Sequence, residues 1–282
     1  MLALLRVLAE DGLINEDLTA PKGDDQADVE TAVLDAIFDR SRGSSLRRVV
    51  DQIHRLASIV RDRISTDTWN SIRQQNIQFI RPRRANSLSG AIEALDQLLL
   101  GLAGCRGLIH DGMIRGPAWQ FLDMGRSVER SHWIRNVMES AIADGNEEHG
   151  EVLDALVDVF DCRITYRMRY MSSVQLAPLM DLLLCDETNP GSLASQVHGL
   201  SDHIRRLPRS SGHAEKTEEQ RHMLNCVHRI ELADIHKLCE DRDTLCEFVV
   251  SVVSDIDSVA SEITRRYLVH AGDFRQVSDE AP

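Results

Sequence analysis

The chain has 282 residues, a formal net charge of −13, and 43% hydrophobic but only 4% aromatic residues. The acidic surplus argues against nucleic-acid binding, which needs a face rich in Lys and Arg. The shortage of aromatic residues argues against a β-sandwich or barrel.

No signal peptide and no apolar run near the roughly 20 residues needed to cross a bilayer is visible, so we expect no membrane segment. The six cysteines are scattered without a CxxC pair, which favours free thiols in a reducing cytoplasm. Nucleotide-binding and hydrolase motifs are missing as well, and no cofactor is expected.

Helical periodicity dominates from end to end. Apolar residues recur every three or four positions over residues 46–64, over one continuous stretch at 151–171, and over residues 245–267. Breakers separate these segments, and no strand-period hairpin is seen. The sequence therefore predicts an all-α bundle of about ten to eleven helices.

Four helix starts carry capping signals. They are Gly116-Pro117, Asn189-Pro190, Thr217 with Gln220, and Thr244 with Glu247.

Shifting the chain by 147 residues aligns two similar turns. Residues 39–46 fall on residues 186–193, and each stretch reads Asp-x-Ser/Thr-x-x-x-Ser-Leu, with Val50 aligned on Val197 farther along. Chance pairing of amphipathic helices explains the apolar matches but not the polar frame, so we predict an internal duplication.

A charged motif, Gly125-Arg126-Ser-Val-Glu129-Arg130, lies inside the helix predicted for residues 117–143. On a helical wheel Arg126 and Glu129 share a narrow arc with Trp119, Leu122, Trp133 and Val137, which predicts that both charges point inward. One interpretation is a buried ion pair that fixes helix register. The other is a site in which Arg126, Glu129 and Arg130 bind an anion or act as acid and base.

A second polar row lies on residues 161–170. Asp161, Thr165 and Arg169 are spaced four apart, as are Tyr166 and Tyr170. These residues could form ordinary ion pairs on a half-exposed helix. Alternatively, Arg167, Arg169 and the two tyrosines, Tyr166 and Tyr170, could face the same cleft as Glu129.

These segments resemble the alpha-E family of bacterial helical proteins. The stretch 115–130 resembles the family's Glu-Arg signature, and residues 161–170 resemble the helix that follows it. Asn189-Pro-Gly-Ser-Leu193 resembles the family's Asn-Pro-x-Ser-Leu helix start. Val60-Arg-Asp-Arg-Ile-Ser65 with Trp69 resembles the corresponding segment in the first half of the family's domain. The resemblance covers about residues 1–272, with halves at roughly 1–113 and 114–272, and leaves a disordered tail at 273–282. The family's usual first Gly-Arg-x-x-Glu-Arg motif is not found in the opening residues, so a missing leading helix is expected.

The resemblance implies association with circularly permuted ATP-grasp proteins, which form amide bonds, and often with transglutaminase-like proteins. The favoured hypothesis is therefore an accessory partner of such a ligase. The alternative is an enzyme of unknown reaction that uses Glu129 as acid or base and Arg126, Arg130, Arg167, Arg169 and Tyr166 to bind its ligand.

A metal site is the weakest hypothesis. His222 and Cys226 are four apart on one predicted helix, and two Glu-x-x-His steps occur. The extra carboxylates that a di-metal bundle needs cannot be identified, so no metal is expected.

Overall fold

The computed structural model describes residues 26–42, 45–79, 87–143, 150–171, 173–207 and 216–268. Two segments with earlier predictions therefore lie outside the described residues: the opening of the chain and the tail 273–282. The described residues form twelve α-helices and no strand, which confirms the all-α class and slightly exceeds the predicted helix number. The chain divides into two compact units, Met1–Trp119 and Gln120–Pro282.

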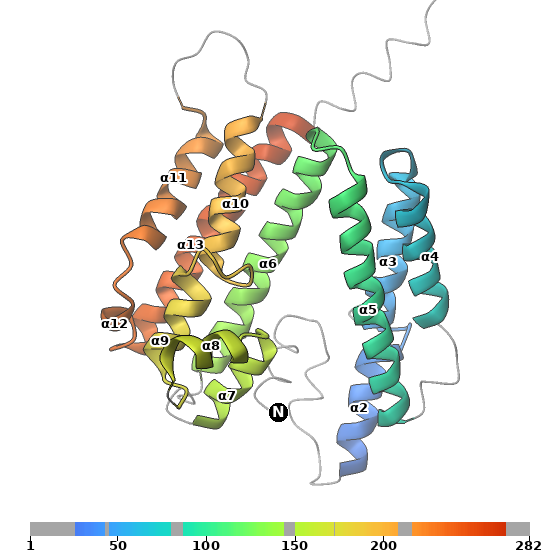
Figure 1. Ribbon diagram of the computed structural model, residues 1–282, viewed down its shortest axis with the longest axis horizontal. Coiled ribbons are helices and arrows are strands. Elements are labelled where there is room, and N and C mark those ends of the chain that lie inside the picture. The colour runs from blue at the N-terminus through green and yellow to red at the C-terminus, as the bar shows by residue number, and fades with distance from the viewer. Residues whose placement is uncertain are drawn as a thin grey trace, which may run out of the picture. The chain divides into compact units, whose positions relative to one another are not determined.

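The first unit is built from α2 (Gln26–Phe38), α3 (Leu46–Ile59), α4 (Thr66–Phe79) and α5 (Leu88–Gly112). Helix α3 packs on α4, α4 packs on α5, and α2 contacts both α3 and α5 (Figure 1). A small core of six buried hydrophobic residues holds the described part of this unit together. They are Phe38, Val50, Phe79, Ala91, Ala94 and Leu98.

Helix α5 alone among the described helices is long and apolar enough to cross a membrane, judged by length and composition. This departs from the expectation from the sequence. A single such helix is weak evidence, although only 22% of its apolar window is buried. Its buried residues, among them Ala94 and Leu98, belong to the core of the first unit.

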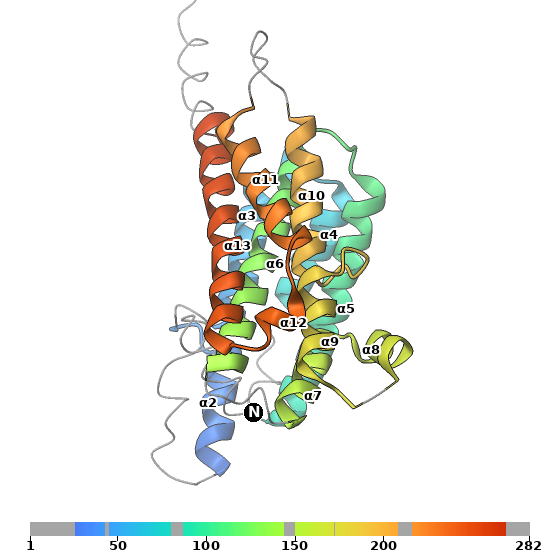
Figure 2. The same ribbon diagram turned by 90° about the vertical axis from the view of Figure 1, so that its left-hand side faces the viewer.

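The second unit contains most of α6 (Pro117–Ala143), then α7 (Gly150–Val159), α8 (Arg163–Tyr170) and α9 (Leu176–Met180), which runs on as a π-helical turn, Asp181–Cys185. It continues with α10 (Leu193–Arg206), α11 (Glu218–Glu231), α12 (Ile235–Leu238) and α13 (Arg242–Ile263), which ends in a second π-helical turn, Thr264–Leu268. Helices α6, α10, α11 and α13 form the long bundle, while α7, α8, α9 and α12 gather near one end of it (Figures 1 and 2).

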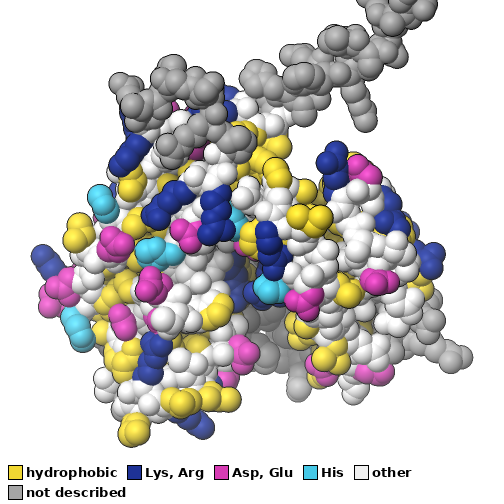
Figure 3. Space-filling model, turned by 45° about the horizontal axis from the view of Figure 1, so that its top comes forward, with side chains coloured by type: hydrophobic (Ala, Val, Ile, Leu, Met, Phe, Trp, Pro, Cys, Tyr) yellow, Lys and Arg dark blue, Asp and Glu magenta, His cyan; other side chains and the backbone are white. Residues whose placement is uncertain are grey.

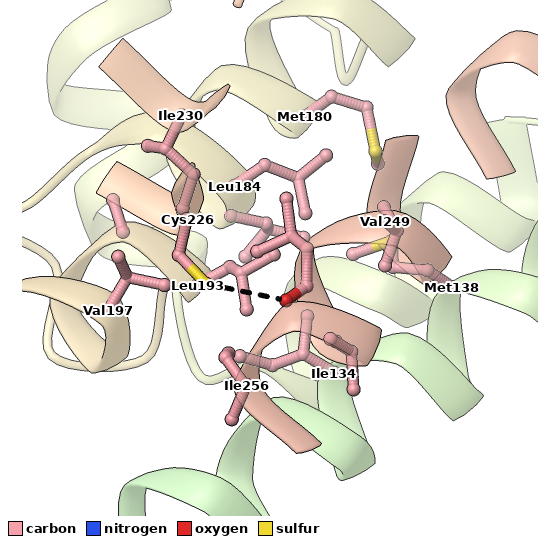
Figure 4. Packing of buried hydrophobic residues seen from close by; sticks show 14 of the residues in the cluster. Ile134, Met138, Met180, Leu184, Leu193, Val197, Cys226, Ile230, Val249 and Ile256 are labelled. Carbon is pink, nitrogen blue, oxygen red and sulfur yellow. Dashed lines mark hydrogen bonds between the residues drawn. The ribbon is translucent and has the colours of Figure 1, made fainter. Parts of the chain in front are cut away.

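The core of the second unit is made mostly of apolar side chains. Ile134 and Met138 of α6, Leu193 and Val197 of α10 and Ile256 of α13 belong to one cluster of buried residues (Figure 4). The predicted stripe on α13 is largely confirmed, because Leu245, Val252, Ile256, Val259 and Ile263 are all buried. This core determines which sides of α6 and α10 are buried. The side of α6 that is buried in turn determines where the charged motif lies.

The predicted continuous stripe over residues 151–171 is wrong. Helix α7 stops at Val159, and Asp161 takes a left-handed backbone conformation, with φ 51°, before α8 begins. Ile164 and Met168, assigned to the stripe, are 77% and 74% exposed. A single non-glycine residue with positive φ redirects the chain, which periodicity cannot detect.

Two of the four predicted helix starts are misplaced. Helix α6 does begin at Pro117, and Thr217 precedes α11, where its backbone N–H donates to Gln220 Oε1 at 3.3 Å. Ser192, not Asn189, caps α10, and Asp241, not Thr244, caps α13. Both errors have one cause: another suitable acceptor lies three residues from the predicted one.

Candidate functional site around the Glu-Arg helix

The prediction that Arg126 and Glu129 point inward is wrong. Both side chains are exposed, and the buried side of α6 carries Met124, Ser131 and Ile134 instead. At 100° per residue Arg126 and Glu129 lie about 140° and 160° around the helix from Ser131. Helix α6 has apolar residues on two sides, and a helical wheel alone cannot show which of them packs against the core.

Arg126 is held by a carboxylate one turn earlier. Its Nη1 lies 3.3 Å from Asp123 Oδ1, while the other oxygen of Asp123 lies 2.9 Å from Nε2 of the buried His203 on α10. Asp123 therefore links the exposed Arg126 to His203, where α6 packs against α10. Sequence reasoning missed Asp123 and His203; the three-residue step from Asp123 to Arg126 was the available signal.

Ser127 marks the line along which α6 and α10 meet. A Cβ added to Gly199 of α10 would stand 4.0 Å from the Ser127 hydroxyl oxygen. Asp123 opposite His203 and Ser127 opposite Gly199 form a short polar seam between the two helices.

Glu129 is exposed and makes no hydrogen bond or ion pair with any part of the chain that the structure describes. An exposed carboxylate of this kind is accessible to water and to a ligand or another protein. The fold therefore gives Glu129 no structural role within the described residues.

Arg130 reaches the start of α10. Its guanidinium lies over the ring of Trp133, 4.9 Å from the centroid, and Trp133 packs against Phe160 with ring centroids 4.7 Å apart. A Cβ built on Gly191 would stand 3.5 Å from Arg130 Nη2. The second residue of the Glu-Arg pair thus lies beside the turn that precedes α10.

That turn is organised by Asp186. One oxygen accepts from the Thr188 backbone N–H at 2.9 Å and from its hydroxyl at 2.7 Å, and the other accepts from Arg169 Nη1 at 2.5 Å. Burial alone would raise the pKa of Asp186, but the hydrogen bonds from Thr188 and Arg169 outweigh it and hold that pKa below its ordinary value. Arg169 in turn has its pKa raised by the bond to Asp186.

The predicted site residues are only partly brought together. Arg130 and Arg169 both reach the 186–192 turn, whereas Arg167 is exposed about 200° away from Arg169 around α8. Tyr166 is 1% exposed; its hydroxyl accepts from the Gln175 N–H at 2.9 Å and lies 3.3 Å from the Ser173 carbonyl oxygen. Tyr166 therefore fastens the segment between α8 and α9.

The possible metal pair is not assembled either. The sulfur of Cys226 faces the Val252 carbonyl in the core at 3.8 Å, and burial raises the pKa of this thiol to about 12 (Figure 4). Over the described ranges no three His, Cys, Asp or Glu side chains are grouped as metal ligands.

The face of the molecule shown in Figure 3 is mixed in charge. Figure 3 shows Lys and Arg, Asp and Glu, and His side chains interspersed with hydrophobic ones on the face in view. No broad field of one sign is therefore expected on this face.

Comparison with known proteins gives a family. Residues 1–268 match the family model Alpha-E, described as a predicted alpha-helical domain with a conserved ER motif. Glu129-Arg130 is the one Glu-Arg step in this sequence.

Two relatives are the uncharacterized protein Rv2567 of Mycobacterium tuberculosis (strain ATCC 25618 / H37Rv) and the uncharacterized protein Mb2597 of Mycobacterium bovis (strain ATCC BAA-935 / AF2122/97). Each is 23% identical over 245 residues, which is 83% of this chain and 28% of the relative. The chain thus spans little more than a quarter of the length of these relatives. No solved structure matches it.

Proposed function

Because this chain belongs to the Alpha-E family, we propose that it is an accessory partner of a circularly permuted ATP-grasp ligase, which forms amide bonds in a peptide or small molecule. A transglutaminase-like protein is a second proposed partner, and the cytoplasm is the proposed location. The ATP chemistry would belong to the ligase, since this sequence carries no phosphate-binding loop.

The observation that carries the proposal is the exposure of Arg126 and Glu129. A charged pair that stabilised the fold would be buried and mutually bonded, whereas these two side chains lie on the side of α6 away from its core. Exposed charges at fixed positions on a long helix are suited to an interface, where they set register and exclude wrong partners. The much greater length of the relatives also favours a domain that works together with further polypeptide.

The test is binding of the purified chain to an ATP-grasp protein encoded beside its gene, measured by calorimetry. Reversing the charge in Glu129→Arg should weaken binding about tenfold or more, as expected when an interfacial charge meets a like charge. The same reversal at Glu247, exposed on α13, is the matched control and should leave the affinity unchanged. Equal affinities for the two variants would refute the proposal.

An enzyme remains the second candidate, because Glu129 is an accessible carboxylate with Arg126 three residues before it and Arg130 directly after it. In that case Glu129 transfers a proton and the arginines hold a carboxylate or phosphate. Glu129→Gln should then abolish product formation in the combined system while binding of the ATP-grasp protein persists. Loss of binding with product formation intact at saturating partner would instead assign Glu129 to the interface.

A further inference from the structure

A cavity of about 660 Å³ lies where α11, α12 and α13 meet, and no residue of the Glu-Arg helix lines it. It is found at the end of the bundle where α12 connects α11 to α13 (Figure 1). Ligand pockets typically have volumes of about 300–1,000 Å³ and combine apolar walls with a few polar groups. This cavity is therefore large enough for a small molecule.

One wall of the cavity is basic. His228 and Arg229 come from the last turn of α11, and Lys237 comes from α12. Arg229 is held in place by Asp255 at 3.3 Å, while Lys237 is exposed and has no ion pair in the described part of the chain. In a protein of net charge −13, an unpaired ammonium at the edge of a cavity is an available anion contact.

The other wall is apolar. Leu232 and Phe248 line it together with Leu238, and Leu232 is 82% exposed at the end of α11. Covering a leucine side chain that is this exposed removes apolar surface from water and therefore favours binding. A ligand that rests on Leu232 and Phe248 would therefore gain hydrophobic stabilisation next to the Lys237 charge.

The surrounding acids limit the charge that such a ligand can carry. Asp234 lines the cavity and caps α12 by accepting from the Lys237 backbone N–H at 3.1 Å. A neighbouring cavity of about 600 Å³ shares Leu232 and Asp234 with it and is lined by Asp181 and Glu231. Because Asp255 already neutralises Arg229, Lys237 is the cation of this lining that has no ion pair among the described residues, which favours a ligand with a single negative charge. The acidic neighbouring cavity repels a second negative group.

From this lining we propose that the cavity binds a small organic carboxylate with an apolar substituent, with its charge at Lys237 and its apolar part on Leu232 and Phe248. The proposal is independent of the function proposed for Glu129, because it concerns different helices and needs no partner protein.

The experiment titrates the full chain with hippurate, an aromatic acyl glycine with one carboxylate, and with hippuramide, which has nearly the same shape but no charge. Hippurate should bind in a saturable manner at least about fivefold more tightly, and only its affinity should fall with rising salt concentration. Equal binding of the two compounds, or no saturation of hippurate up to about 10 mM, would overturn the proposal.

Variants locate the site. Lys237→Gln should weaken hippurate binding about five- to tenfold, in the range expected for one hydrogen bond of ordinary net strength at an exposed side chain. Lys216→Gln, at an exposed lysine outside the cavity lining, should leave it unchanged. Leu232→Ser, on a surface side chain whose loss does not open the core, should weaken both compounds. Identical affinities in Lys237→Gln and Lys216→Gln would contradict the assignment.

Discussion

The two turns that align at a spacing of 147 residues share a hydrogen-bond frame but differ in their surroundings. Asp39 Oδ1 accepts from the backbone N–H and the hydroxyl of Ser41, both at 2.8 Å, as Asp186 does from Thr188. Ser45 caps α3 as Ser192 caps α10. The duplication itself stays a prediction, which this shared frame supports.

The difference lies in what each carboxylate reaches. The Asp39 side chain is 33% exposed, and Arg42, its charged neighbour, lies 3.6 Å away within the same turn. Asp186 is 10% exposed and is bound by Arg169 from a separate helix. Similar sequence therefore specifies a similar local turn, while the tertiary partner determines how much that turn contributes to the stability of the protein.

Asp186→Ala should give the largest effect. It would leave the Arg169 guanidinium and both Thr188 donors without their acceptor, at a cost of about 3 kcal/mol. Asp39→Ala, at the exposed equivalent, should destabilise less. Urea unfolding followed by tryptophan fluorescence measures both, and equal losses would show that the turns are energetically equivalent.

Thiol labelling compares the interiors of the two units. Cys226 is completely buried in the large second core, whereas Cys105 of α5 is 6% exposed and lies 3.0 Å from the Ser71 hydroxyl. We expect Cys226 to react with a thiol reagent about a hundredfold more slowly than Cys105, since its exposure needs opening of the larger core. Mass spectrometry of labelled peptides gives both rates. Faster labelling of Cys226 would reverse the ranking.

The cap serines provide a finer test. Ser192 Oγ accepts from the Ser195 N–H at 3.0 Å and donates to the Asp186 carbonyl at 2.6 Å, whereas Ser45 Oγ accepts from Arg48 at 3.4 Å. Ser192→Ala should cost about 2 kcal/mol, and Ser45→Ala about 0.5–1 kcal/mol. Thermal melts of the two variants and the wild type give this difference. A larger loss for Ser45→Ala would contradict it.

Acid sensitivity should show the smallest effect. Because the folded-state pKa of Asp186 lies below its ordinary value of 3.8, its contribution is complete above that value and is lost as the pH falls through the lowered pKa. Arg169→Gln removes one of the hydrogen bonds that lower the pKa of Asp186. The variant should lower the free energy of unfolding at neutral pH by about 1 kcal/mol, and its stability should fall less steeply below about pH 4. An unchanged slope would mean that Arg169 does not stabilise the carboxylate.

The sequence was sufficient for the fold class, the family and the repeated turn frame, because these follow from local patterns of a few residues. It was not sufficient to predict which side of α6 faces the core. Leu122 and Trp133 make one side of that helix apolar, and Ile134 and Met138 make another side apolar. Only the packing against other helices of the second unit, α10 and α13 among them, selects between the two sides.

The candidate site was predicted in part for the same reason. Arg130 and Arg169 were recognised as site residues, but their meeting place, the turn at Asp186, depends on the long-range placement of α8 beside the start of α10. His203 went unnoticed since an isolated histidine on a helical stripe gives no sequence signal until its partner, Asp123, is placed opposite it.

Helix α8 lies between two left-handed residues, Asp161 with φ 51° and Met171 with φ 48°. Its eight residues thus act as a spacer of set length, and one inserted residue would turn Arg169 by about 100° and shift it by about 1.5 Å relative to Asp186. Relatives that differ in length should therefore accept insertions before Asp161 or after Met171 far more readily than between them.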